Sequence, residues 1–178
     1  MENKRKVVYK GFSVVSKDDG YEVVEVTDSV GVLIFDIQSQ NFVFVRQKRP
    51  PMKNKSCPSG VIMEVPAGRF DKKVSLKQLI IDEVWEEVGI KIDKSHIQLL
   101  NYGHPLALSP GILTERMYLA YVEIEDLRDL ETKEGTTFGV ASEGEETERI
   151  FVSIHDINDM GFDDLKTYAL VKNFQIDN

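Results

Sequence analysis

The sequence is poor in cysteine, in long apolar segments and in basic side chains. Its single cysteine, Cys57, cannot form a disulfide bond within the chain, and nothing around it suggests a zinc-binding knuckle. No apolar segment approaches the roughly 20 residues that a helix needs to span a bilayer. None follows the basic residues near the start of the sequence, as it would in a signal peptide. We therefore expect a cytoplasmic protein with no membrane partner.

Acidic residues outnumber basic ones, 30 to 22, which gives a formal net charge of −8. Sequence-independent nucleic-acid binding relies on Lys and Arg to neutralise phosphates, so this balance argues against nucleic acid as a partner. A small anionic substrate is still compatible with it, because a bound divalent cation inverts the local field. The length of 178 residues fits one domain with a small appendage and is sufficient to bury a core.

The order of apolar segments predicts an α/β domain preceded by a small antiparallel unit. Residues 7–26 have the pattern of two short strands around a turn at residues 17–20. Apolar runs at residues 30–35 and 42–45 predict a hairpin of buried strands, and residues 50–60 are rich in loop-forming residues. Four further strands are expected at residues 61–65, 97–102, 117–124 and 149–153. A final helix is expected at residues 163–174 and a long loop at residues 125–148.

The best-defined helix is predicted from about Ser75 to Val88. Ser75 and Gln78 have the spacing of a capping box, and Gly89 occupies the position of a left-handed C-terminal cap. One side of this helix is apolar and is expected to face the core, with the residues Ile80, Val84, Trp85 and Val88.

Three glutamates of this helix, Glu83, Glu86 and Glu87, occupy an arc of about 100° on one side. As like charges four residues apart, Glu83 and Glu87 destabilise an isolated helix by roughly 0.2–0.5 kcal/mol. The macrodipole also disfavours anions in the C-terminal half. A solvated face would more often interleave lysines, and none occurs between residues 78 and 90. Clustered carboxylates suit a hard cation such as Mg²⁺, although three glutamates on a helix are by themselves more often surface charge.

The segment GRFDKKVSLKQLIIDEVWEEVGI, residues 68–90, resembles the Nudix hydrolase signature. That signature reads Gly, five residues, Glu, seven residues, then Arg-Glu-apolar-x-Glu-Glu-x-Gly-apolar. Val74 replaces its first Glu and Asp82 replaces its Arg, two side chains that pair in the family. Losing both together avoids stranding one charge. The positions in register are Gly68, Glu83, Val84, Glu86, Glu87, Gly89 and Ile90.

The resemblance continues in residues 28–50, in MEVPAG (63–68) and in LSPGILTER (108–116), which look like the ADP-ribose and nucleoside-diphosphate-sugar pyrophosphatases. The sequence DEVWEEVG is similar to the UDP-sugar diphosphatases within that branch. The resemblance implies a Nudix fold, an α/β/α sandwich with a mixed sheet (residues 28–178). It also implies a small N-terminal antiparallel β-sheet (residues 1–27) that builds a homodimer.

The implied activity is Mg²⁺-dependent hydrolysis of the pyrophosphate bond of a nucleoside diphosphate sugar. ADP-ribose, UDP-glucose and GDP-mannose are all compatible substrates, and the products would be a nucleoside monophosphate and a sugar phosphate. Mn²⁺ is an alternative cation. Base and sugar are left open by the sequence.

The resemblance also implies roles for individual residues. Glu143, in the acidic run at residues 142–146, would be the catalytic base. Arg49 would face substrate phosphate, while Glu64 and Glu115 would contact the nucleotide or the dimer mate. The metal ligands would be the Ala67 carbonyl, Glu83, Glu87 and Glu145, with Glu86 holding a second metal or an ordered water.

Two other functions compete with this interpretation. The first is a Nudix enzyme acting on nucleoside triphosphates or dinucleoside polyphosphates, against which the N-terminal hairpin and residues 109–111 argue. The second is a catalytically weak Nudix-fold module that binds a nucleotide sugar without cutting it. Val74 and Asp82 support the binding module, and the retained glutamates count against it.

Overall fold

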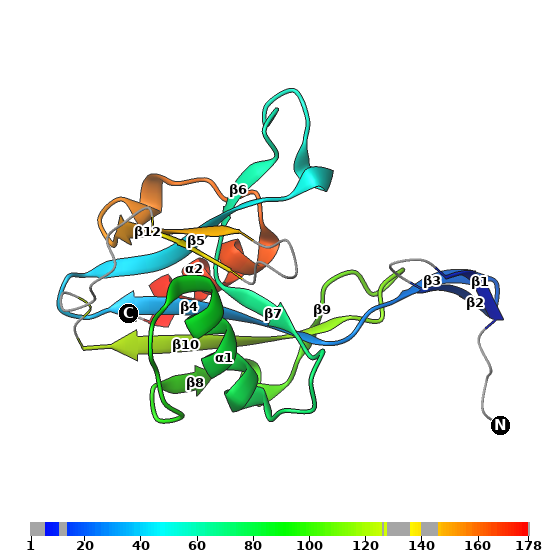
Figure 1. The fold of residues 1–178 in the computed structure, drawn as a ribbon, viewed down its shortest axis with the longest axis horizontal. Coiled ribbons are helices and arrows are strands. Elements are labelled where there is room, and N and C mark those ends of the chain that lie inside the picture. The colour runs from blue at the N-terminus through cyan, green and yellow to red at the C-terminus, as the bar shows by residue number, and fades with distance from the viewer. Residues whose placement is uncertain (1–5, 11–13, 126, 128–135, 140–145, 178) are drawn as a thin grey trace.

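The computed structural model describes residues 6–10, 14–125, 127, 136–139 and 146–177. Within these residues a nine-stranded mixed sheet forms the body of the protein, and a separate three-stranded sheet projects from one end (Figure 1). No helix in the described part of the chain is long and apolar enough to cross a membrane. The predicted base Glu143 and metal ligand Glu145 lie outside the described residues.

The projecting sheet is antiparallel, in the order β1 (Lys6–Lys10), β2 (Val14–Asp18) and β3 (Tyr21–Glu25). The sequence predicted two strands here and the structure has three. The turn predicted at residues 17–20 is confirmed, because Asp19 and Gly20 connect β2 to β3 with φ angles of 49° and 87°. Glycine adopts such a positive φ without strain.

The main sheet runs in the order β11-β12-β5-β4-β10-β8. Strand β4 pairs in parallel with β10, and its other pairs, with β5 and β7, are antiparallel. Strands β5 and β7 share one edge of β4, because β5 pairs with residues 34–36 and β7 with residues 29–31. The strand bounds are β4 Ser29–Asp36, β5 Asn41–Lys48, β6 Val61–Glu64, β7 Ala67–Arg69, β8 Ile97–Leu99, β9 Leu106–Ala107, β10 Arg116–Ile124, β11 Thr137–Phe138 and β12 Thr147–Ser153.

Two helices cover the two faces of this sheet and create two apolar cores. Helix α1 (Leu76–Val88) packs on the face that carries Val30, Val32 and Ile34. Helix α2 (Leu165–Asp177) packs on the opposite face, which carries Leu33 and Phe42. Burial on both faces explains why β4 is buried along its whole length. The predicted α/β/α sandwich with a mixed sheet is confirmed.

Local sequence signals set the ends of both helices. Ser75 accepts a hydrogen bond from the backbone N–H of Gln78 at 3.2 Å, and Gly89 ends α1 with a φ of 66°. The predicted span of α1 is therefore confirmed. Asp164 accepts from the backbone N–H of Thr167 at 2.9 Å and begins α2 in the same way.

Three connections differ from or refine the prediction. The strand expected at residues 97–102 ends at Leu99, because Asn101 and Tyr102 both have positive φ angles. The loop expected at residues 125–148 contains β11, whose residue Thr137 pairs with Glu148 of β12. The loop at residues 50–60 is confirmed and includes a 3₁₀ turn, η1 (Pro50–Met52). Two other connections in the described part of the chain also contain such a turn, η2 (Asn101–Gly103) and η4 (Ile157–Asp159).

Candidate active site

Two glutamates of helix α1, Glu83 and Glu87, contact strand β7 with their side chains. A Cβ atom placed on Gly68 would overlap the carboxylate of Glu83, so only glycine leaves room for that side chain. Gly68 is itself held in the main sheet opposite Val30 of β4. The first glycine of the sequence signature therefore has a physical reason: it is the platform on which the Glu83 carboxylate lies.

Glu87 contacts Ala67, which precedes Gly68 on β7. Its side chain is 4% exposed, and its Oε2 atom accepts a hydrogen bond from the backbone N–H of Ala67 at 2.8 Å. The structure thus brings together Ala67, Glu83 and Glu87, three of the predicted metal-ligating residues. Two carboxylates one helical turn apart repel each other, and partial burial strengthens that repulsion. A cation beside them would offset this cost.

The third glutamate of the helix, Glu86, is more exposed. Its Oε1 atom lies 3.9 Å from Nζ of Lys72, and both side chains of this pair are partly in solvent. Exposed ion pairs of this kind contribute about 0–1 kcal/mol. The Glu86 side chain is therefore held less firmly than those of Glu83 and Glu87.

The structure gives the two departures from the signature a physical account. Asp82 accepts a hydrogen bond from the side-chain amide of Gln78 at 2.8 Å, one turn earlier on α1. Val74 packs against the apolar core on the α1 face. The position of a charged pair is thus taken by an amide–carboxylate hydrogen bond and an apolar contact. Neither substitution leaves a buried charge without compensation.

The donor types around β7 fit a divalent cation such as Mg²⁺, which prefers carboxylate and carbonyl oxygens. Among the residues that the structure describes, no three Asp, Glu, His or Cys side chains converge closely enough to form a metal site by themselves. A complete ligand set would therefore need a main-chain carbonyl or a further side chain in addition to Glu83 and Glu87.

The C-terminal end of α1 is hydrogen-bonded to residues on both sides of residues 140–145. The backbone N–H of Gly139 donates to the carbonyl of Glu86 at 3.1 Å. The Thr147 hydroxyl donates to the carbonyl of Glu87 at 2.9 Å. Gly139 and Thr147 are thus bonded to adjacent residues in the last turn of α1.

Sequence comparison identifies the family of this arrangement. The sequence model of the NUDIX domain matches residues 26–171. The chain belongs to the Nudix family. The uridine diphosphate glucose pyrophosphatase NUDT14 of Mus musculus is 24% identical over an aligned length of 175 residues, and the match covers 82% of this chain and 76% of that protein. Both matches identify the chain as a Nudix hydrolase, and α1 is the helix that carries the family's glutamates.

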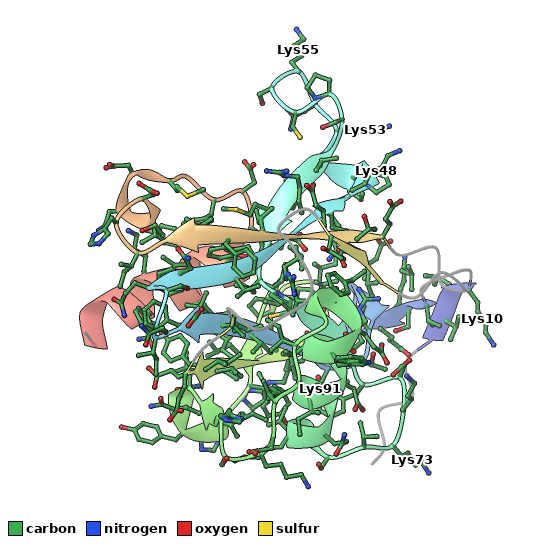
Figure 2. All side chains as sticks on the ribbon, turned by 60° about the vertical axis from the view of Figure 1, so that its left-hand side comes forward. Lys10, Lys48, Lys53, Lys55, Lys73 and Lys91 are labelled. Carbon is green, nitrogen blue, oxygen red and sulfur yellow. The ribbon has the colours of Figure 1, made fainter. Side chains whose placement is uncertain are left out.

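In this Nudix hydrolase Arg49 and Glu64 contact each other. Nη2 of Arg49 lies 2.7 Å from Oε2 of Glu64, whose side chain is buried. Nζ of Lys166 lies 3.4 Å from the same Glu64 oxygen and 2.9 Å from Asp164. The backbone N–H of Arg49 donates to the carbonyl of Gly60 at 2.7 Å and so closes the projecting loop that carries Lys53 and Lys55 (Figure 2). The sequence does not connect Lys166 with Glu64, because the two residues are more than 100 positions apart along the chain.

Glu115 is buried and directly precedes β10. It accepts a hydrogen bond from the Ser29 hydroxyl at 2.6 Å. Ser29 pairs with Met117 of β10 on one side and with Arg69 of β7 on the other. Glu115 thus lies one strand away from the strand on which Glu83 and Glu87 dock.

The prediction that Trp85 lies in the core of the Nudix domain is wrong. Its side chain is 50% exposed, and Nζ of Lys91 lies 5.4 Å from the ring centroid. The prediction rested on Trp85 lying on the side of α1 away from the glutamates. Since Glu83 and Glu87 themselves face β7, Trp85 points away from the sheet and into solvent.

Proposed function

We propose that this Nudix hydrolase cuts the pyrophosphate bond of a nucleoside diphosphate sugar in an Mg²⁺-dependent reaction. The observation that carries the proposal is the docking of Glu83 and Glu87 on β7, beside a helix end whose carbonyls accept hydrogen bonds from Gly139 and Thr147. Because Gly139 and Thr147 flank Glu143 and Glu145 in the sequence, these contacts support the assignment of Glu143 and Glu145 to the same site. The mouse relative, named as a uridine diphosphate glucose pyrophosphatase, supports the substrate class.

The chain's own oxygen atoms would hold the cation. When bound, the cation would supply Lewis acidity that offsets the negative charge of the pyrophosphate and lowers the pKa of water. Mg²⁺ is the proposed ion and Mn²⁺ the alternative. We assign the ligands to the Ala67 carbonyl, Glu83, Glu87 and Glu145, with Glu86 for a second ion or an ordered water.

Other residues would activate water and orient the substrate. Glu143 would accept the proton of the attacking water as a general base. Arg49 would face a substrate phosphate, with its guanidinium oriented by Glu64. Glu64 and Glu115 are both buried, so direct contact of either with a nucleotide would need a bound substrate to reach below the protein surface.

A substrate panel tests the proposal. The purified chain is incubated with UDP-glucose, ADP-ribose, GDP-mannose, ATP and a dinucleoside polyphosphate, with Mg²⁺ and with EDTA, and the products are separated by chromatography. We expect Mg²⁺-dependent release of a nucleoside monophosphate and a sugar phosphate from at least one nucleotide sugar. Cleavage of ATP or of the dinucleoside polyphosphate alone would favour a different Nudix enzyme. A thermal shift with a nucleotide sugar but no cleavage would favour the binding module.

The N-terminal sheet is proposed to build a homodimer. Val7, Val8 and Tyr21 are 54%, 47% and 69% exposed on this projecting unit. A sheet of so few strands buries little apolar surface by itself, so association with a second copy would cover these side chains. The division into residues 1–27 and 28–178 stays a prediction of the sequence, as does the cytoplasmic location.

Sedimentation velocity at micromolar concentration tests the dimer. We expect the wild type to sediment as a dimer and the double variant Val7→Lys, Val8→Lys as a monomer, because two buried cations would oppose association. Leu165→Lys is the matched control, since Leu165 is also an exposed apolar residue but lies on α2, and this variant should leave the dimer intact. A wild type that is monomeric under these conditions contradicts the proposal.

A further inference from the structure

Arg149 of β12 is the largest side chain that the described structure buries completely. Burial lowers the pKa of its guanidinium, yet arginine remains charged at neutral pH. A fully buried cation is costly unless its surroundings stabilise it. The contacts of the Arg149 side chain therefore indicate its role in the structure.

The guanidinium of Arg149 lies at the C-terminal end of α1, between aromatic rings. Its Nη1 atom donates a hydrogen bond to the carbonyl of Val88 at 2.8 Å. Its Cζ atom lies 5.2 Å from the ring centroids of both Phe138 and Phe151. Phe138 in turn packs against Gly89, because a Cβ atom on that glycine would overlap its ring. One side chain thus contacts the last residue of the helix and the strands on either side of residues 140–145.

The final carbonyls of a helix lack partners within the helix. In α1 those of Trp85, Glu86, Glu87 and Val88 accept hydrogen bonds from the Gly89 N–H, the Gly139 N–H, the Thr147 hydroxyl and Arg149. The Arg149 bond is the charged one, and a cation at a helix C-terminus is stabilised by the macrodipole. The positive charge of Arg149 also offsets the negative charges of the glutamates in the same half of the helix.

We infer that Arg149 is a positioning residue that fixes the last turn of α1 against β11 and β12 and thereby holds Glu87 in place on β7. Arg149 does not act on substrate. It sets the orientation of the turn that carries Glu87, in the way that residues behind a metal ligand commonly set its geometry. The link to metal binding rests on the proposed function, whereas the fixing of the helix end does not.

Arg149→Met tests this inference, because Met retains most of the apolar volume and removes the charge and the hydrogen bond. Hydrogen exchange of the full chain without added metal should show the amides of Val88 and Gly89 exchanging about tenfold faster or more. The Mg²⁺ concentration for half-maximal activity should rise about 10–100-fold, the range found when residues behind metal ligands are replaced. Arg149→Lys, which keeps the charge, should restore part of both effects.

Ile150→Ala is the matched control. Ile150 is buried on the same strand but faces the α2 core, so its replacement should lower the melting temperature without changing exchange at the end of α1 or the Mg²⁺ requirement. If Arg149→Met and Ile150→Ala behave alike in both measurements, Arg149 is merely structural and the inference is wrong. Faster exchange with an unchanged Mg²⁺ requirement would overturn the link to Glu87.

A milder variant covers the case in which Arg149→Met does not fold. Thr147→Val is nearly isosteric and removes only the hydrogen bond to the Glu87 carbonyl. It should shift exchange and the Mg²⁺ requirement in the same direction by a smaller factor, and no shift in either would count against the inference. If the wild type cleaves no nucleotide sugar, the proposed function fails, while the exchange measurement still decides the structural role of Arg149.

Discussion

Glu143→Gln is expected to lower kcat about 10²–10⁴-fold while substrate binding persists. Gln keeps the shape of the side chain and one acceptor oxygen, but it cannot accept a proton, and general-base catalysis typically contributes a factor of this size. The measurement is kcat and KM for the best nucleotide sugar, over a range of Mg²⁺ concentrations. High Mg²⁺ should not restore the Glu143 variant. Glu145→Gln should instead weaken metal binding and be partly rescued by high Mg²⁺.

The neighbouring glutamates serve as controls for the alignment of this acidic run. Glu148 forms an ion pair with Arg46 at 3.1 Å across β12 and β5, which gives it a structural contact of its own. Glu146 is exposed, so Glu146→Gln should retain activity. If Glu146→Gln is inactive and Glu143→Gln is active, the alignment is wrong although the family stands. If no glutamate from 143 to 148 matters, the base lies elsewhere, for example at Glu86.

Gly68→Ala is expected to raise the Mg²⁺ requirement as strongly as Glu83→Gln does. The added Cβ atom would occupy the space of the Glu83 carboxylate, so that side chain must leave its position on β7 even though no charge has been removed. Loss of a metal ligand or of its support should cost about 10–100-fold or more in metal affinity or activity. The measurement is activity as a function of Mg²⁺ concentration in both variants.

Gly161→Ala is the matched control for that substitution. Nothing lies within 4 Å of a Cβ atom at Gly161, so this variant should keep the wild-type Mg²⁺ dependence. A Gly68→Ala variant with unchanged Mg²⁺ dependence would show that the position of Glu83 on β7 is not needed for metal binding.

Local signals in the sequence were sufficient to predict α1 and its ends. Ser75 and Gly89 act on backbone groups within a few residues of themselves, so their effect is legible without knowledge of the rest of the fold. The buried strands β4 and β5 were predicted for a similar reason, since uninterrupted apolar runs indicate strands covered on both faces. Strand β11 was missed because its two residues are held by β12, whose partner residues lie about ten positions further along.

The residues that contact the site's elements from distant parts of the sequence were not predictable in the same way. Arg149 acts on a carbonyl 61 residues earlier, and Thr167 accepts a hydrogen bond from the backbone N–H of Val65 across 102 residues. Nothing in the immediate neighbourhood of either residue marks it. The error at Trp85 has a related origin. Periodicity separates the two sides of a helix, but which side faces the sheet depends on the strand that packs against it.

The N-terminal sheet is attached to the main body through the segment that leads into Glu115. Val24 exchanges backbone hydrogen bonds with Ile112 and Thr114, and the Thr114 hydroxyl bonds to Val26. Thr114 directly precedes Glu115. If the sheet shifts when it associates with another molecule, residues 112–114 must shift with it or lose these bonds. Association at the sheet and ligand binding near Glu115 would then be thermodynamically linked, and each would change the affinity of the other by the same factor.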